Sequence, residues 1–354
     1  MGEAIEYRKC RRFALHSGPL KEIMSLTVLE LCAGAGGQAT GLEAAGFDLA
    51  AAIEIDHYAC DTLRKNRPRW KVIERSITEV NGKDFRGIDL LAGGVPCPPF
   101  SIAGKQLGTK DERNLFPEAL RFVREAKPKA VLLENVPGFA SDRFSEYRRN
   151  LFQEFSELGY EVHGCILNAC WVGVSQLRPR FVLVAFRGSF PESFVWPGPN
   201  GSKVPTVGDT LIDLMSSRNW KGADRWRHKA CGIAPTLVGG SRKHGGPDLG
   251  PTRARKQWAK FGVDGLGLAD EPPGRDHPVH FTPRLTIRMT ARIQGFADSW
   301  SFSGGKTAAY RQIGNAFPPP VAHAIGDAIG VAILGKVVRG PRRVQMRLFE
   351  AAYR

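Results

Sequence analysis

Short apolar runs alternate with segments of helical spacing over the first half of the chain. The runs LTVLEL, DLAAAIEI and AVLLEN are apolar and partly β-branched, which predicts buried strands. The segments EALRFVREA and FSEYRRNLFQEFSEL place apolar residues three or four positions apart, as helices do. Strands that alternate with helices predict an α/β fold with a doubly wound, mostly parallel sheet, whose binding sites lie at the carboxyl ends of the strands.

This pattern changes along the chain and suggests five parts. After residue 188 the sequence becomes rich in Gly, Pro, Arg, His and Trp, and its periodicity is poor until about residue 283. Order then resumes, and a late stretch reads as an amphipathic helix preceded by prolines. We therefore expect an arm at 1–25, a first domain at 26–188, a loop-rich stretch at about 189–283, an ordered region from about 284 to 335 and a basic tail at 336–354.

Composition and charge narrow the class of protein. The 354 residues are 42% hydrophobic and 24% charged, as in an ordinary soluble globular protein. No run reaches the roughly 18 apolar residues of a membrane span, and the charged N-terminus lacks the apolar core of a secretory signal. The seven cysteines form no CxxC pair, which argues against a zinc site and fits a reducing cytosol. The net charge of +15 favours a polyanionic partner, nucleic acid before anionic membrane, although a merely basic enzyme remains an alternative.

A glycine-rich turn follows the first predicted strand. Gly34 begins a Gly-x-Gly-x-x-Ala pattern that ends at Ala39, and Glu54 stands at the end of the second strand. Glycines at such a turn let a ligand approach the main chain, and the acid can accept hydrogen bonds from ribose hydroxyls. The pattern indicates a nucleoside-cofactor site of the kind that NAD and S-adenosylmethionine enzymes share. The alternative is a tight turn without a ligand.

Three further strand ends carry candidate catalytic groups. Cys97 lies in the proline-rich loop GVPCPPFS, where a nucleophile would be presented, although a lone cysteine is also often a small buried hydrophobe. Glu134 could have a raised pKa and donate a proton, or it could cap a helix or form an ion pair. Arg178 and Arg180 would point to the same side of a strand and could grip a carbonyl, a phosphate or a carboxylate; the alternative is a solvated strand edge.

The order of these segments is more specific than any one of them. The series LCAGAGG, GGVPCPPFS, ENVPGF, QLRPRF, RLTIRMTARIQGF and YRQIGNAFPPP resembles the DNA cytosine-5 methyltransferases of the compact restriction–modification type. The resemblance covers roughly residues 26–335, apart from the irregular part. It implies a Rossmann-like, S-adenosylmethionine-dependent catalytic domain at 26–188. It also implies a smaller, irregular target-recognition domain at 189–304, with its variable insert at 189–283, and a segment at 305–335 that returns to the catalytic domain.

The resemblance also assigns roles to the candidate residues. Cys97 would attack C6 of a cytosine flipped out of the duplex, Glu134 would protonate or hydrogen-bond N3, and Arg180 with Arg178 would hold the base O2. The implied cofactor is S-adenosyl-L-methionine, with S-adenosyl-L-homocysteine as product and no metal. The implied cofactor-binding residues are Cys32, Ala33, Gly34, Gly36, Gly37, Glu54, Ile55, Ser76, Ile77, Gly94, Pro96, Leu115 and Asn315.

The chain departs from the family pattern at three positions. Ser76 stands where an aspartate near the adenine amine is frequent, which puts one charge-assisted contact in question. Pro98 follows the cysteine where many relatives carry glutamine, and Met289 replaces a common glutamate. None of these changes removes a catalytic group.

The irregular insert is the expected reader of double-stranded DNA. Its arginines can read guanine edges and its lysines can anchor phosphates, with Trp226 and Trp258 interleaved; a single basic residue there can equally be solvated surface. The resemblance also implies a bacterial-type cytoplasmic location, associated with the nucleoid through DNA, and no membrane partner. A cognate restriction endonuclease could act on the same site without a stable complex. The expected DNA-binding residues are Ser101, Arg225, Arg227, Arg242, Lys243, Arg253 and Arg255.

Three other functions remain open. A tRNA cytosine-5 methyltransferase of the same family would carry a different insert, and the Cys-Phe-Thr tripeptide of that branch is absent. A non-catalytic DNA-binding relative would not need Cys97, Glu134 and Arg180. An NAD-dependent oxidoreductase would use the glycine turn and Glu54 but leaves Cys97 and the positive charge unexplained.

Overall fold

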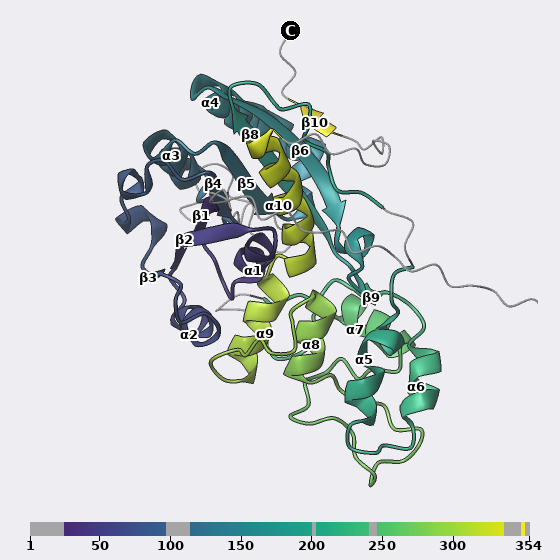
Figure 1. Cartoon of the computed structure of the whole chain (residues 1–354). Helices are drawn as coiled ribbons and strands as arrows, with labels where there is room; N and C mark the ends of the chain where they lie inside the picture. Colours follow the sequence, from purple (N-terminus) through teal and green to yellow (C-terminus); the bar gives the residue numbers. More distant parts are fainter. Residues whose placement is uncertain (1–24, 97–113, 200–202, 241–245, 336–347, 351–354) are drawn as a thin grey trace, which may run out of the picture.

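One sheet forms the centre of the molecule (Figure 1). The computed structural model describes residues 25–96, 114–199, 203–240, 246–335 and 348–350. Eight strands within this part of the chain pair in the order β10-β6-β8-β5-β4-β1-β2-β3. They are β1 Leu26–Leu31, β2 Phe47–Glu54, β3 Val72–Glu74, β4 Leu90–Gly93, β5 Ala130–Asn135, β6 Tyr160–Asn168, β8 Pro179–Arg187 and β10 Leu348–Glu350.

The sheet is mostly parallel, as the sequence predicted. Strands β3, β2, β1, β4 and β5 run in the same direction. Strand β8 is antiparallel to both of its neighbours, β5 and β6. The connection from β6 to β8 has no crossover helix of the length that a parallel pair requires, so these two strands pair as antiparallel neighbours.

Helices cover both faces of the sheet, because alternate side chains of each buried strand point to opposite sides. Leu29 and Leu31 of β1 belong to the core that includes α3 and α4, whereas Val28 belongs to the core that includes α1 and α10. The helices of this domain are α1 Gly37–Ala44, α2 His57–Asn66, α3 Phe116–Ala126, α4 Ser145–Glu157, α9 Lys306–Asn315 and α10 Pro319–Leu334.

The late apolar stretch is a core helix of this fold. By length and composition alone, residues 306–334 could cross a membrane. The structure divides the stretch into α9 and α10, and α10 packs against α1 (Figure 1). Its Val321, Ile325 and Ile329 are buried in one core with Leu42 and Phe47.

The irregular part contains more helix than the sequence predicted. Its helices α5 to α7 gather at the end of the molecule opposite β10 (Figure 1). Trp226 and Trp258 are buried in the core of this part, and neither is available at a DNA-reading surface. The two tryptophans that the sequence interleaves with basic residues therefore belong to the core, because these large side chains supply the apolar area that short helices need. The elements are α5 Val207–Ser216, α6 Ala223–Lys229, α7 Thr252–Lys260, α8 Ile287–Gln294 and the strand pair β7 Gln176–Leu177 with β9 Ala234–Pro235.

Candidate active site

A pocket of about 320 Å³ opens at the carboxyl ends of β1, β2, β4 and β5. Its wall combines the glycine turn, these strand ends and the end of α9, and Glu134 lies in the same wall. The structure therefore brings together segments far apart in the sequence, at the sheet edge where ligands of open α/β folds bind. The predicted cofactor residues in this wall are Cys32, Ala33, Gly34, Gly37, Glu54, Ile55, Ser76, Ile77, Gly94, Pro96, Leu115 and Asn315.

Gly34 and Gly36 of the turn are glycines for different structural reasons. Gly34 has φ +53° and open space where a side chain would lie, so its backbone stays accessible in the pocket. Gly36 has φ +81°, and a Cβ there would lie 2.7 Å from Leu63 Cδ2 and 3.2 Å from Trp300 Cζ2. Gly36 is not in the described pocket wall, and the packing behind the turn explains it without a ligand contact.

The Glu54 carboxylate fixes the shape of the turn and faces the pocket. Its Oε2 accepts a hydrogen bond from the Gly34 N–H at 2.7 Å, and its Oε1 accepts bonds from the Ile55 and Asp56 N–H groups. Burial raises the pKa of Glu54, and the main-chain donors partly oppose that rise. The neighbouring Ile55 side chain is 65% exposed at the pocket, although it is apolar.

Polar atoms without partners lie deeper in the wall. Glu30 Oε2 and both amide heteroatoms of Gln38 are buried and have no hydrogen-bond partner in the described structure. Both side chains line the pocket, so these atoms are free to hydrogen-bond a polar ligand there. An exposed aliphatic side chain, an adjacent carboxylate and a polar interior fit the adenine, ribose and amino-acid parts of S-adenosylmethionine.

Glu134 and Arg180 form a buried ion pair beside this pocket. Arg180 Nε lies 2.7 Å from Glu134 Oε1, and each side chain is only 12% exposed. The pair joins β5 to the antiparallel β8, where Glu134 is opposite Val182. Burial raises the pKa of Glu134, and the nearby guanidinium of Arg180 offsets part of that rise. The other carboxylate oxygen lies near Gly94, since a Cβ built there would be 3.3 Å from it.

Residues 26–331 match the family described as C-5 cytosine-specific DNA methylase. The chain belongs to this family. It is 52% identical to the Type II methyltransferase M.NaeI of Lentzea aerocolonigenes, over 88% of this chain and 76% of that protein. It is also 52% identical to M.NgoMIV of Neisseria gonorrhoeae, over 86% of this chain and 97% of that protein. The resemblance predicted from the motifs is confirmed, and the protein is a DNA (cytosine-5-)-methyltransferase.

Solved structures share the fold of this methylase at low sequence identity. The Dnmt2 methyltransferase of S. pombe has a TM-score of 0.59 and 19% identity, over 88% of this chain and 98% of that one. A Spodoptera frugiperda DNMT2 mutant has a TM-score of 0.60 and 18% identity, over 86% of this chain and 100% of that one. These likenesses confirm the Rossmann-like methyltransferase fold.

Arg178 of this methylase has contacts other than those the sequence predicted. Its side chain is fully buried, and its guanidinium donates to the carbonyl oxygens of Leu237, Gly314 and Ala316 at 2.7–2.9 Å. Arg178 lies between β7 and β8, where the alternation of a regular strand does not apply. These contacts tie the irregular part to the end of α9 and use both terminal nitrogens of the guanidinium, while Glu134 and Arg180 are charged neighbours of Arg178. A role for Arg178 at the base stays a prediction.

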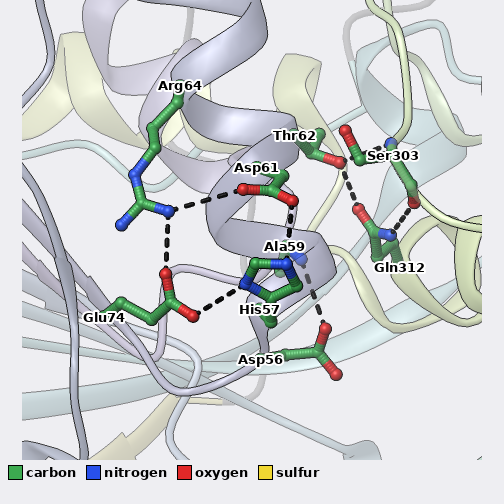
Figure 2. Close-up of polar contacts among 9 residues, drawn as sticks. All are labelled: Asp56, His57, Ala59, Asp61, Thr62, Arg64, Glu74, Ser303 and Gln312. Carbon is green, nitrogen blue, oxygen red and sulfur yellow. Dashed lines mark hydrogen bonds and ion pairs between the residues drawn. The ribbon is translucent and has the colours of Figure 1, made fainter.

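Two sets of contacts near the methylase pocket had no signal in the sequence. Arg311 of α9 pairs with Asp56 at 3.1 Å, and both line the pocket. Figure 2 shows the second set, in which Gln312 accepts a hydrogen bond from Thr62 and donates to the Ser303 carbonyl oxygen. Thr62 and Gln312 are 250 positions apart and Asp56 and Arg311 are 255 apart, so only the fold brings α2 and α9 together.

The predicted DNA-binding residues are only partly described. Cys97, Ser101, Arg242 and Lys243 lie outside the described residues. The others are on α6 and α7 of the irregular part, where Arg227 pairs with Asp209 at 2.9 Å. Arg225, Arg227 and Arg253 are exposed, and Arg255 is half-buried. Of the part of the chain that the structure describes, no group of three or more His, Cys, Asp or Glu residues could hold a metal ion.

Proposed function

We propose that this enzyme methylates a flipped-out cytosine in a short double-stranded DNA sequence through a covalent bond between Cys97 and C6. The observation that carries the proposal is the buried Glu134–Arg180 pair in reach of the pocket with the glycine turn. Pro96 lines the same pocket, and Cys97 follows it directly in the chain. A base, a nucleophile and a methyl donor can therefore meet at one sheet edge.

Glu134 and Arg180 bind and protonate the base in this proposal. A cytosine that enters beside Glu134 presents N3 to the carboxyl group and O2 to the guanidinium. Burial raises the pKa of Glu134, which is the direction that favours proton donation to N3. The contacts of Arg180 with Glu134 and with the Pro179 carbonyl oxygen orient its guanidinium, which has further N–H donors for O2.

Cys97 supplies the electrons that activate the ring. Its thiolate forms a bond to C6, the C5–C6 π electrons shift to form a C4–C5 double bond, and the C4–N3 π electrons move to N3, which takes the proton from Glu134. S-adenosylmethionine, when bound, supplies a methyl group on a positively charged sulfur. Transfer of the C5 proton to a water molecule, return of the N3 proton to Glu134 and departure of the S–C6 electron pair with sulfur then restore the aromatic ring and the Cys97 thiolate. A base inside a stacked duplex cannot undergo these steps, so the cytosine must be flipped out.

The biological setting follows from the relatives' names. M.NaeI and M.NgoMIV are named Type II methyltransferases. We infer that this enzyme is likewise the modification enzyme of a restriction–modification system in a bacterial cytoplasm. A cognate endonuclease would act on the same site without a stable complex. S-adenosylhomocysteine would be the product, and no metal would be required.

Covalent trapping tests this proposal. The substrate is a pool of random-sequence duplexes in which 5-fluorocytosine replaces cytosine, because fluorine at C5 blocks the final elimination. With S-adenosylmethionine present, the wild-type protein should form a complex stable to denaturing electrophoresis, and Cys97→Ser should form none. Trapping by Cys97→Ser at the wild-type level, or no wild-type adduct, contradicts the proposed adduct. Trapping on tRNA but not on DNA would favour the RNA substrate.

A further inference from the structure

The segment 97–113, which begins with Cys97, is bounded on both sides by residues of the pocket wall. Pro96 precedes Cys97 directly, and Asn114 is the next described residue. The Leu115 N–H donates to the Pro96 carbonyl oxygen at 3.2 Å, so a main-chain hydrogen bond joins the two ends of the segment. Both Pro96 and Leu115 line the pocket. The positions of these two ends therefore determine where the segment leaves and rejoins the pocket wall.

Tyr147 of α4 holds the second of these ends. Asn114 Nδ2 donates to the Tyr147 hydroxyl oxygen at 2.8 Å, and the hydroxyl donates to Asn114 Oδ1 at 3.2 Å. Asn114 Oδ1 also accepts a hydrogen bond from the Phe116 N–H at the start of α3. The Asn114 amide thus joins the start of α3 to α4, a helix that contributes no residue to the described pocket wall.

Four aromatic rings extend this contact toward the base-binding pair. Phe116 is stacked on Phe139, with ring centroids 5.1 Å apart, and Phe139 lies 5.0 Å from Phe181. The Tyr147 ring packs on the same cluster, 6.2 Å from Phe116 and 6.0 Å from Phe139. The three phenylalanines are buried. Close-packed rings cannot shift independently, so this cluster fixes the segments that contribute its members.

The rings of this cluster come from the segments that carry the proposed reacting groups. Phe181 follows Arg180 directly in β8. Phe139 lies in the short turn that follows β5, the strand of Glu134. The ring at the start of α3 belongs to the end of the segment that begins with Cys97. The cluster therefore links three groups that have to meet one cytosine.

We propose that Tyr147, through its hydrogen bonds to Asn114, is a positioning residue for the attack of Cys97 on C6. The inference rests on the proposed function. Tyr147 needs no contact with the base or the cofactor for this role, because Asn114 transmits its effect to the end of the segment. Reacting groups must approach from fixed positions, and a misplacement of about 1 Å can cost about 10² in rate. Loss of the Tyr147 hydroxyl should therefore slow the S–C6 bond formation and leave cofactor binding intact.

The rate of adduct formation by the full chain tests this role. The protein, in excess and with S-adenosylmethionine, is mixed with the random-sequence 5-fluorocytosine duplexes described above. Tyr147→Phe keeps the ring of the cluster and loses only the hydroxyl, while Arg148 still holds α4 to the Phe139 carbonyl oxygen. We expect adduct formation to slow by about tenfold or more. The Kd for S-adenosylhomocysteine should change by less than about twofold.

Tyr160→Phe is the matched control. The Tyr160 hydroxyl donates to the Pro128 carbonyl oxygen at 2.7 Å, and its ring packs against Phe155. This contact lies at the amino ends of β5 and β6, the sheet edge opposite the pocket. Both variants lose one hydroxyl hydrogen bond and should lower the melting temperature. Adduct formation by Tyr160→Phe should stay within about twofold of wild type.

Asn114→Leu and the double variant identify the path of the effect. Asn114→Leu should slow adduct formation at least as much as Tyr147→Phe. Adding Tyr147→Phe to Asn114→Leu should slow it no further, because both changes break the same hydrogen bonds. Asn114→Leu decides the matter if Tyr147→Phe does not fold.

Four outcomes would overturn the inference or its basis. A wild-type rate in Tyr147→Phe, or equal slowing in Tyr160→Phe, would mean that the hydroxyl serves stability alone. Independent, multiplied losses in the double variant would mean that Tyr147 does not act through Asn114. A matching rise in the Kd for S-adenosylhomocysteine would mean that the change distorts the whole pocket. A wild-type protein that forms no adduct would contradict the proposed function itself, which is a separate failure from unaffected variants.

Discussion

Arg180 Nε lies 2.7 Å from Glu134 Oε1, and both side chains are almost completely buried. Burial disfavours each charge, and the short contact compensates for that cost only while both partners are present. The pair therefore stays fixed between β5 and β8, at the pocket that holds the glycine turn. In the proposed mechanism, this fixed pair is the preformed edge that recognises a cytosine.

Glu134→Gln removes the acidic proton of residue 134 but keeps an oxygen that can pair with Arg180. The amide oxygen can still accept from Arg180, but the side chain cannot supply the acidic proton for N3. We expect kcat to fall by about 10² to 10⁴, the usual range for loss of a general acid, with a small change in melting temperature. Steady-state methylation assays measure kcat, and the variant Glu157→Gln, at an exposed position, is the control. A kcat within tenfold of wild type would contradict the role of Glu134.

Arg178→Met should lower the stability of the fold. The substitution leaves the carbonyl oxygens of Leu237, Gly314 and Ala316 without their buried donor. We expect the free energy of unfolding to fall by about 3 kcal/mol or more, since each unsatisfied buried group costs about 1–3 kcal/mol. Urea denaturation measures this change. If stability is unchanged and methylation is lost, Arg178 acts in base binding and not in stabilising the fold.

Trp300→Phe should weaken cofactor binding from behind the glycine turn. Trp300 is buried, its indole N–H donates to the Ala35 carbonyl oxygen at 3.1 Å, and its ring lies against Gly36. Phenylalanine keeps an aromatic ring but loses the donor. We expect the Kd for S-adenosylhomocysteine to rise by about five- to tenfold, equivalent to one hydrogen bond.

Trp226→Phe is the matched control for this experiment. Trp226 is equally buried, but its indole N–H has no hydrogen-bond partner in the described structure. Both variants should lower the melting temperature, because both remove buried ring atoms. Equal effects of the two variants on the Kd would show that Trp300 acts only through general packing.

Glu30 should make the ligand-free protein less stable at high pH. Its folded-state pKa is raised, so the native state binds a proton more tightly than the unfolded state. The stability due to that proton is complete below the unfolded pKa of about 4.3 and is lost as the pH rises through the folded pKa.

Glu30→Gln removes this dependence. The variant's unfolding free energy should decline less than the wild type's above about pH 4.3, by about 1.4 kcal/mol for each unit of pKa difference. Urea melts across pH 4–9 give both curves. Parallel curves would mean that Glu30 does not retain its proton in the native state. The exposed Glu157→Gln should leave the slope unchanged.

The sequence predicted the elements that local pattern determines. The strands around the glycine turn, and Glu54 at the end of β2, follow from apolar runs and turn residues. Helices α5 to α7 were missed because they are short and interrupted by Gly and Pro segments that mask their periodicity. The sequence shows Trp226 and Trp258 only as neighbours of basic residues, and packing between these short helices buries them.

Side-chain partners were harder to predict than elements. The expectation for Arg178 used strand alternation at a position where β7 has ended and β8 has not begun. Glu30 and Gln38 gave no signal, because an unpaired buried atom is recognised only once its surroundings are known. Arg311 reaches the pocket from a helix that is distant in sequence. The motifs therefore predicted where the site lies, whereas the partner of each polar side chain is known only from the fold.

The most direct test of the account is bisulfite sequencing of DNA from cells that express this protein, beside cells that express Cys97→Ser. The account predicts protected cytosines within one recurring short motif in the first sample and none above background in the second. Protection that persists in the Cys97→Ser sample would contradict the nucleophile. Absence of protected cytosines with soluble, cofactor-binding protein would contradict methylation of DNA by this chain.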